Sequence, residues 1–267
     1  MIALGRFRIA CHLIPWGPRR DAETAAVLRE IAEAGYEGVE GLRAAEPERM
    51  LELCALARAC GLQPVNVGAG DAEARIRWNA VLGNAASEVP SQRRAARGAP
   101  LDDGALAAAA AALEGPLAEC RRLGLRGFHH AHMGTYIETV EDAERLLARV
   151  PALWLLWDTG HILASGSDPL RVFQSDLRYR IGHVHLKDFH ANDPRGWDHR
   201  SGRFNQEARF AELGQGNVGF DTAAALAGLE GAGYQGWVSV ELDRPYPERS
   251  PAEGAARNRA YLRSLGY

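Results

Sequence analysis

The sequence predicts an α/β fold in which eight parallel strands, each followed by a helix, close into a barrel. Short apolar runs alternate along the chain with longer segments of helical period, which is typical of repeated βα units around a parallel sheet. Four of those runs, between residues 127 and 243, end in histidine or carboxylate side chains. The length of 267 residues is ordinary for a one-domain barrel, so we expect a single domain over residues 1–267.

The first units of the barrel are clearly marked. Two helical segments end at Gly35 and Gly61, as a left-handed C-terminal cap favours. Trp16 follows the first strand and is either a ring that stacks on a substrate or a structural aromatic. We expect strands at residues 8–14, 36–42 and 62–68, and helices at residues 21–35 and 47–61.

Residues 70–105 contain the one poorly marked strand of the eight. The segment has a short helical start and continues as a polar, arginine-rich stretch with two prolines. It is therefore either a degenerate barrel strand or a loop over the site. A helix follows at residues 105–124, where an alanine run favours helix and the pair Gly115-Pro116 is expected to kink or divide it.

The carboxyl-terminal half repeats the pattern four times, and residues 190–216 interrupt it. That interruption is long and polar, and long segments of this kind in compact domains are usually lids, binding loops or linkers. Its position directly after a strand that ends in site residues favours a lid. We expect strands at residues 125–130, 152–158, 181–187 and 236–242, and helices at residues 138–149, 168–177, 219–231 and 251–265.

Composition excludes several classes of protein. The chain is 46% apolar and 24% charged with a net charge of −3, so bulk charge does not indicate nucleic-acid binding. The first residues lack the apolar core of a signal peptide, and no apolar run approaches the length of a membrane span. The four cysteines have no metal-binding spacing, so we expect reduced thiols and a cytoplasmic protein.

The run LWLLWD ends in Asp158, with His161 three residues later. A carboxylate at the tip of so apolar a strand is costly to bury unless a cation or strong donors compensate it. We therefore favour metal ligation for Asp158, and the alternative is an N-cap for the following turn. His161 is expected at the same mouth of the barrel, in contact with substrate or a second metal.

The run IGHVHLKD places His183, His185 and Lys187 on one face of a strand, since alternate side chains point the same way. His185 lies nearer the end of the strand and is the preferred metal ligand, with His183 as support below it. Lys187 is a candidate acid or anion-binding group.

In WVSVELD the same alternation places Glu241 on one face with Ser239. A buried glutamate needs a partner, which is either a metal or an arginine such as Arg244. Asp243 lies beyond the strand and is expected to be solvated.

The cluster GFHHAHMG contains three histidines that cannot all face the barrel interior. Alternation pairs His130 with His132 and leaves His129 outward or at an edge, so at most two of the three are expected to be functional. Imidazole and carboxylate groups converging from separate strands are typical of a catalytic metal site.

Several segments together resemble a known superfamily. They are HMGTYIET, WDTGHILASGSDP, HVHLKD, GQGNVGFD and GWVSVELD. They are similar to the xylose-isomerase-like TIM barrels, a superfamily of sugar isomerases and epimerases, and within it to the inosose dehydratase branch, which removes water from 2-keto-myo-inositol (scyllo-inosose). The resemblance is strong over residues 125–245 and covers the amino-terminal half only as a general βα pattern.

The resemblance implies a metal quartet and a chemistry. The superfamily commonly uses Glu, Asp, His and Glu, which implies Asp158, His185 and Glu241 here, with His130 in the place of the first glutamate. Isomerases and epimerases of the superfamily use the two glutamates as paired bases, so His130 favours elimination of water over epimerisation. Glu241 would be the base, and Lys187, His161 or His132 the acid. The implied cofactor is a divalent ion, with Mn, Co, Zn and Fe equally suited to these ligands.

The sequence therefore predicts a metal-dependent lyase that dehydrates a cyclic polyol ketone, with a small sugar or inositol-derived molecule as substrate. The alternative within the superfamily is a metal-dependent ketose isomerase or epimerase. A third alternative is a barrel that binds sugar or metal without turnover. A nuclease would need more metal ligands and a basic groove. The sequence leaves the oligomeric state open, with a homodimer or higher homo-oligomer among the alternatives.

Overall fold

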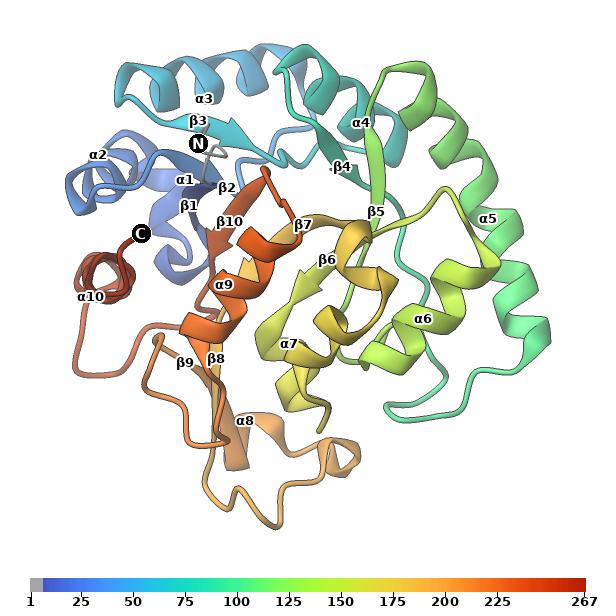
Figure 1. Ribbon diagram of the computed structural model, residues 1–267. Coiled ribbons are helices and arrows are strands. Elements are labelled where there is room, and N and C mark those ends of the chain that lie inside the picture. The colour runs from blue at the N-terminus through green and yellow to red at the C-terminus, as the bar shows by residue number, and fades with distance from the viewer. Residues whose placement is uncertain (1–6) are drawn as a thin grey trace.

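A parallel sheet of eight strands, enclosed by helices, forms the protein (Figure 1), and the computed structural model describes residues 7–267 of the chain. The strands follow one another in the order β3-β2-β1-β10-β7-β6-β5-β4, and all of their pairings are parallel. The predicted barrel is confirmed. The strands are β1 (Arg8–His12), β2 (Gly38–Glu40), β3 (Gln63–Val65), β4 (Ala86–Glu88), β5 (Arg126–His130), β6 (Trp154–Asp158), β7 (Ile181–Leu186) and β10 (Trp237–Val240).

The helices lie outside the sheet, and their ends carry the capping residues that the sequence indicates (Figure 1). Gly35 and Gly61 both adopt the left-handed conformation, at φ +89° and +77°, so the two predicted helix ends are confirmed. The α-helices are α1 (Arg19–Ala22), α2 (Thr24–Ala34), α3 (Pro47–Ala59), α4 (Ala72–Val81), α5 (Asp103–Arg122), α6 (Val140–Arg149), α7 (Thr159–Ala164), α8 (Phe204–Glu207), α9 (Thr222–Gly231) and α10 (Pro251–Ser264), and the 3₁₀ helices are η1 (Ile14–Trp16), η2 (Pro169–Gln174), η3 (Asp176–Arg180) and η4 (His199–Ser201). Among residues 7–267, no helix combines the length and the apolar character needed to cross a membrane.

The poorly marked strand within residues 70–105 is β4, and it is three residues long. Its central residue, Ser87, is fully buried although it is polar, so the strand has no apolar run that a sequence pattern could reveal. β4 pairs with β5 along its whole length. Of the two alternatives for this segment, the short barrel strand is the correct one.

Two expected helices differ from the structure. The pair Gly115-Pro116 does not divide α5, because buried Leu113 and Leu117 anchor the turns on either side of the proline. The expected helix at residues 168–177 was wrong: this stretch forms the 3₁₀ helices η2 and η3, while α7 follows β6 directly. Side-chain oxygens of Asp168 and Ser175 each accept a backbone hydrogen bond, from Leu170 and Leu177, and these local bonds replace a continuous helical ladder.

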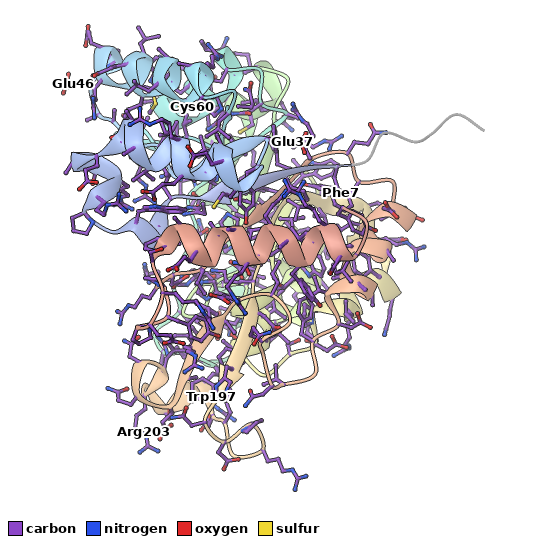
Figure 2. The ribbon with its side chains drawn as sticks, turned by 90° about the vertical axis from the view of Figure 1, so that its left-hand side faces the viewer. Phe7, Glu37, Glu46, Cys60, Trp197 and Arg203 are labelled. Atoms are coloured by element: carbon purple, nitrogen blue, oxygen red, sulfur yellow. The ribbon has the colours of Figure 1, made fainter. Side chains whose placement is uncertain are left out.

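Residues 190–216, interpreted as a lid, contain a folded hairpin. β8 (Asp188–Ala191) pairs antiparallel with β9 (Ala208–Ala211). Phe189 and Phe210 of this hairpin pack with Met133 in a small apolar cluster that is separate from the main core. Trp197 packs against this cluster and donates a hydrogen bond to the carbonyl of Ala164 at the end of α7. Figure 2 shows Trp197 and Arg203 far from Phe7, which precedes β1. The hairpin is therefore attached at the end of the barrel where the strands finish.

An asparagine joins the two edges of the sheet. Within residues 7–267 no ladder connects β3 to β4, and buried Asn79 of α4 lies between them. Its Oδ1 accepts from Val67 N at 3.1 Å, and its Nδ2 lies 3.3 Å from Val67 O and 3.2 Å from Ser87 Oγ. One amide side chain thereby satisfies groups on both sides of the seam, as a strand ladder would.

Replacing Asn79 by leucine should therefore destabilise the barrel by about 2 to 4 kcal/mol, because the buried Val67 backbone and Ser87 hydroxyl would lose their partner. Urea unfolding of the variant measures this free energy. Arg77→Ala, on an exposed position of the same helix, is the control and should change stability little. Equal stabilities for the two variants would show that the seam does not depend on Asn79.

Candidate functional site

The four ligand candidates implied by the sequence meet at the carboxyl end of the sheet. His130 ends β5, Asp158 ends β6, His185 lies near the end of β7, and Glu241 directly follows β10. Asp158 is paired in register with His185, which is in turn paired with Ser239 of β10. Asp158, His185 and Glu241 are buried, and the side chain of His130 is 17% exposed. The structure thus brings together side chains that are up to 111 residues apart, from His130 to Glu241.

Asp158 uses its two carboxylate oxygens differently. Oδ1 accepts a hydrogen bond from the backbone N–H of His161 at 2.9 Å and so caps the start of α7. Oδ2 lies 3.1 Å from His130 Nε2 and 3.4 Å from His185 Nδ1. Capping was the alternative to metal ligation in the sequence. The structure contains the cap, and because Oδ2 still faces the two histidines, the cap does not exclude metal ligation.

Glu40, at the end of β2, is a site residue that sequence reasoning missed. Its Oε1 accepts from His185 Nε2 at 3.0 Å and from Asn66 Nδ2 at 2.7 Å, and its Oε2 lies 2.8 Å from His183 Nε2. Burial opposes its ionisation, but the two histidines outweigh burial and hold the pKa of Glu40 well below its usual value. The signal was available, since Glu40 is also a carboxylate at the tip of an apolar strand. His12, at the end of β1, lines the same cavity and was missed in the same way.

The bond to Glu40 orients His185. Because Nε2 faces the Glu40 carboxylate, Nδ1 points toward Glu241 Oε2, 2.6 Å away. His185 Nδ1 and Glu241 Oε2 are both buried, and neither atom has a hydrogen-bond partner despite this short distance. Burial disfavours charge on the imidazole, but Glu40 and Glu241 raise the pKa of His185 well above its usual value. The surroundings of His185 Nδ1 therefore favour a positive charge there, which either a proton or a metal ion supplies.

Lys187 is fully buried among carboxylates. Its Nζ lies 3.2 Å from Asp158 Oδ2 and 3.3 Å from both Glu241 Oε1 and Asp243 Oδ1. Burial opposes the ammonium form, yet Asp158 and the other two carboxylates raise the pKa of Lys187 above its usual value. A proton held this firmly favours charge stabilisation over proton donation. Lys187 and His185, not an arginine, are the partners of Glu241, and Asp243 is not simply solvated but pairs with Lys187.

His132 and His161 lie against each other beside the quartet, with 3.6 Å between ring centroids. His132 Nδ1 faces the carbonyl of Met133 at 2.7 Å and must therefore donate to it, which leaves the lone pair on Nε2. Burial is the main reason that the pKa of His132 falls to about 4 and that of His161 falls well below its usual value. Both rings are neutral at neutral pH.

His129 and Trp16 are the two remaining candidates, and both have structural roles. His129 points away from the cluster and is fully buried, and neither of its ring nitrogens has a hydrogen-bond partner. Trp16 is buried in the core and donates from Nε1 to Glu30 at 2.6 Å. Trp16 is therefore the structural aromatic of its two alternatives.

Residues outside the site hold its loops in place. Arg94, from the arginine-rich stretch, is buried with Glu138 and Asp142, and Glu138 in turn accepts from Gly134 N at 2.6 Å. This network secures the loop that carries His132. The carboxylate of Asp188 similarly accepts the backbone N–H groups of residues 189, 214 and 216, which ties the GQG segment to the end of β7.

The site surrounds a cavity of about 240 Å³. This volume is below the 300–1,000 Å³ that is usual for drug-sized ligands, so a single small ring is the expected occupant. Its lining is mostly polar and includes His12, Glu40, Asn66, His130, His132, His161, His185, Glu241 and Asp243.

The donor set fits a divalent metal. Ligand atoms of His130, Asp158 and His185 all lie within 4.8 Å of one another, and Glu241 is in contact with His185. The buried atoms His185 Nδ1 and Glu241 Oε2, which lack hydrogen-bond partners, face one another at this point. A mixed imidazole and carboxylate set of this kind suits Mn, Co, Zn or Fe. Glu40 would be the outer carboxylate that orients the ligand histidine.

Comparisons with known proteins agree with this architecture. The family model for the xylose isomerase-like TIM barrel matches residues 28–265. The inosose dehydratase of Geobacillus thermodenitrificans (strain NG80-2) is 34% identical over 145 residues, which cover 52% of this chain and 48% of that protein. The chain thus spans about half the length of the curated relatives it matches.

Two solved structures share the fold across nearly the whole chain. A xylose isomerase-like TIM barrel protein from Mycobacterium smegmatis, in complex with magnesium, has a TM-score of 0.73 at 17% identity, covering 99% of this chain and 98% of that one. D-allulose 3-epimerase from Methylomonas sp., in complex with D-allulose, has a TM-score of 0.68 at 17% identity, covering 98% of each chain. At such identities the likeness is one of fold.

The burial of His129 predicts sensitivity to acid. Burial lowers the pKa of His129 from 6.5 to about 3, so the unfolded chain takes up this proton before the folded one does. Stability is therefore lost as the pH falls below 6.5, and the loss from this group ends near pH 3. We expect His129→Leu to reduce the stability lost between pH 6.5 and 4.5 by about 2 to 3 kcal/mol, measured by urea unfolding at each pH. His190→Gln, in β8, is the control; if the His129→Leu variant keeps the wild-type pH dependence, His129 does not cause it.

Proposed function

Because this chain belongs to the xylose isomerase-like TIM-barrel family, we propose that it is a divalent-metal-dependent lyase that removes water from a cyclic polyol ketone such as 2-keto-myo-inositol (scyllo-inosose). The observation that carries the proposal is that His130, His185 and Glu241 line one small cavity, with Asp158 in contact with both histidines. The name of the curated relatives, inosose dehydratase, supports the choice of reaction.

The quartet would hold the metal ion, which when bound would polarise the substrate ketone and stabilise the enolate. Glu241 is the proposed base. Burial opposes its ionisation, but Lys187 and His185 hold the pKa of Glu241 well below its usual value, so it is ionised at neutral pH. Its Oε2 lies 2.6 Å from His185 Nδ1 at the cavity, and as an ionised carboxylate Glu241 is the proposed acceptor of the proton on the carbon next to the ketone.

Elimination then requires the loss of the hydroxyl on the next carbon. As Glu241 removes the C–H proton, the electron pair forms the new C=C bond, the C–O bond breaks, and the hydroxyl leaves with a proton as water. His132 and His161 line the cavity and are the proposed donors of that proton. Both rings are neutral at rest, so one of them would first take up a proton from water, as the free Nε2 lone pair of His132 permits, and a lowered pKa makes the resulting imidazolium a strong acid. Lys187 contributes a fixed positive charge beside Glu241.

A ketose isomerase or epimerase is the second candidate. It is favoured by Glu40, which offers a second carboxylate in the same cavity as Glu241. Glu40 is, however, already engaged by His183, His185 and Asn66. A base so fully hydrogen-bonded is poorly placed to exchange a proton with substrate, and for that reason we prefer dehydration.

With scyllo-inosose and Mn²⁺ or Co²⁺, we expect a rise in ultraviolet absorbance as the diketone forms. Glu241→Gln should lower turnover by at least about a hundredfold, since it removes the base without changing the shape of the side chain. Glu33→Gln, on the exposed face of α2, is the matched control. A flat absorbance with keto-inositols, together with interconversion of ketohexoses, would favour the isomerase.

Glu40→Gln should weaken metal binding by about 10- to 100-fold, because His185 would lose the carboxylate that orients its ring. Isothermal titration of the metal-depleted variant with Mn²⁺ measures the affinity, and circular dichroism checks that the variant is folded. Unchanged affinity in a folded Glu40→Gln protein would mean that Glu40 does not position His185.

A further inference from the structure

Two arginines line the cavity on the side of the barrel opposite Glu241 and His185. Arg43 follows β2, and Arg75 projects from α4 between β3 and β4. Both also line a second hollow that adjoins the cavity. In the strand order, the seam between β3 and β4 lies opposite β10 and β7, which carry Glu241 and His185. A ligand that reaches from the quartet across the cavity would therefore meet these two guanidinium groups.

The backbone directs Arg43 toward this position. The neighbouring segments are held together by hydrogen bonds from Gly68 N to Leu42 O and from Ala44 N to Gly68 O. The aliphatic stem of Arg43 lies across Gly68, so closely that a Cβ there would stand 2.8 Å from Arg43 Cγ. Within residues 7–267, no carboxylate forms an ion pair with Arg43. Its guanidinium donors are available to a ligand.

Arg75 is only partly neutralised. Its Nη1 lies 2.8 Å from a carboxylate oxygen of Glu88, while its Nε is buried without a hydrogen-bond partner. A buried guanidinium N–H without an acceptor is costly, and a ligand oxygen would supply the acceptor. With Glu88 counted, Arg43 and Arg75 leave one net positive charge on this wall.

Asn66 lies on the same side and has a free acceptor. Its Nδ2 is bonded to Glu40, and its buried Oδ1 has no partner. Asn66 also adopts φ +40°, in the left-handed region that asparagine tolerates better than most residues. An acceptor at this point suits a hydroxyl group of a ligand that spans the cavity.

We propose that Arg43 and Arg75 form an anion subsite, and that the substrate is a polyhydroxy ketone that carries a carboxylate or phosphate at the end away from Glu241 and His185. A guanidinium binds the paired oxygens of either anion through two parallel N–H bonds. The inference rests on the proposed function for the position of the ketone, while the anion subsite rests on the arginines alone. It extends the proposed substrate class from neutral polyol ketones to those that also carry an anionic group, and it predicts that the anionic ones bind more tightly.

Binding of three matched sugars tests the subsite without any need for turnover. The probes are D-glucose, D-glucuronate and D-glucose 6-phosphate, titrated calorimetrically into the Mn²⁺-loaded protein. We expect at least one charged sugar to bind about tenfold or more tightly than D-glucose, as charge-assisted hydrogen bonds imply. The carboxylate and phosphate probes distinguish the two sources of the anion.

Variants then test whether the arginines cause the tighter binding of the charged sugar. Arg43→Gln and Arg75→Gln should each reduce this preference for the charged sugar. Arg49→Gln, at an exposed arginine of α3 that pairs with Glu52, should leave it unchanged. Gly68→Ala keeps every charge but displaces the stem of Arg43, so it should weaken the preference too. Equal affinity for charged and neutral sugars would overturn the proposal, as would a preference that survives in both arginine variants, since the anion would then be bound elsewhere.

The outcome is separable from that of the proposed function. Glu241→Gln should lose turnover yet keep the preference for the charged sugar. If no ketone is dehydrated but the arginine-dependent preference is observed, the reaction is wrong and the subsite stands. If scyllo-inosose is dehydrated efficiently while charged sugars have no advantage, the reaction stands and the subsite is wrong.

Discussion

The carboxyl end of the barrel depends on balancing buried negative charge. Glu40, Asp158 and Glu241 are all nearly inaccessible to water, and a carboxylate in such a place is unfavourable without a cation beside it. The single positive charge of Lys187 is in contact with two of them, Asp158 and Glu241, and His185 lies between Glu40 and Glu241. The same balance holds Glu241 ionised and leaves His185 Nδ1 directed at a carboxylate oxygen. Stability and the proposed metal site therefore depend on one set of charges.

That charge cluster is useful only because neighbouring groups keep its members in position. Asp158 caps α7 with one oxygen and faces the histidines with the other, so the start of the helix and the ligand position are coupled. Glu40 sets which nitrogen His185 presents, and Arg94 secures the loop of His132 through Glu138. Such outer contacts place reacting groups on rigid elements, which is what a catalytic site requires.

The sequence patterns found the elements with strong periodicity and failed where tertiary contacts replace it. β4 is too short and too polar to show alternation, because β5 and the seam satisfy its backbone and Ser87. The helix expected at 168–177 became two 3₁₀ turns, because Asp168 and Ser175 bond locally to the backbone. Among the site residues, Glu40 was overlooked although it ends a strand as the others do, since its role follows from contacts with residues 143 and 145 positions away.

The sequence by itself determined the barrel, the strand ends and the candidates His130, Asp158, His185 and Glu241, because strand alternation and the shared polarity of parallel strands place such residues on one face. Only the tertiary structure decided the protonation and the partners of each group. It buried Lys187 among three carboxylates, left His129 outside the cluster, joined Glu40 to His185, and put Arg43 and Arg75 on the wall opposite Glu241 and His185. The reason is physical: pKa values, tautomers and cavity linings depend on distances between distant segments, and no local pattern encodes those distances.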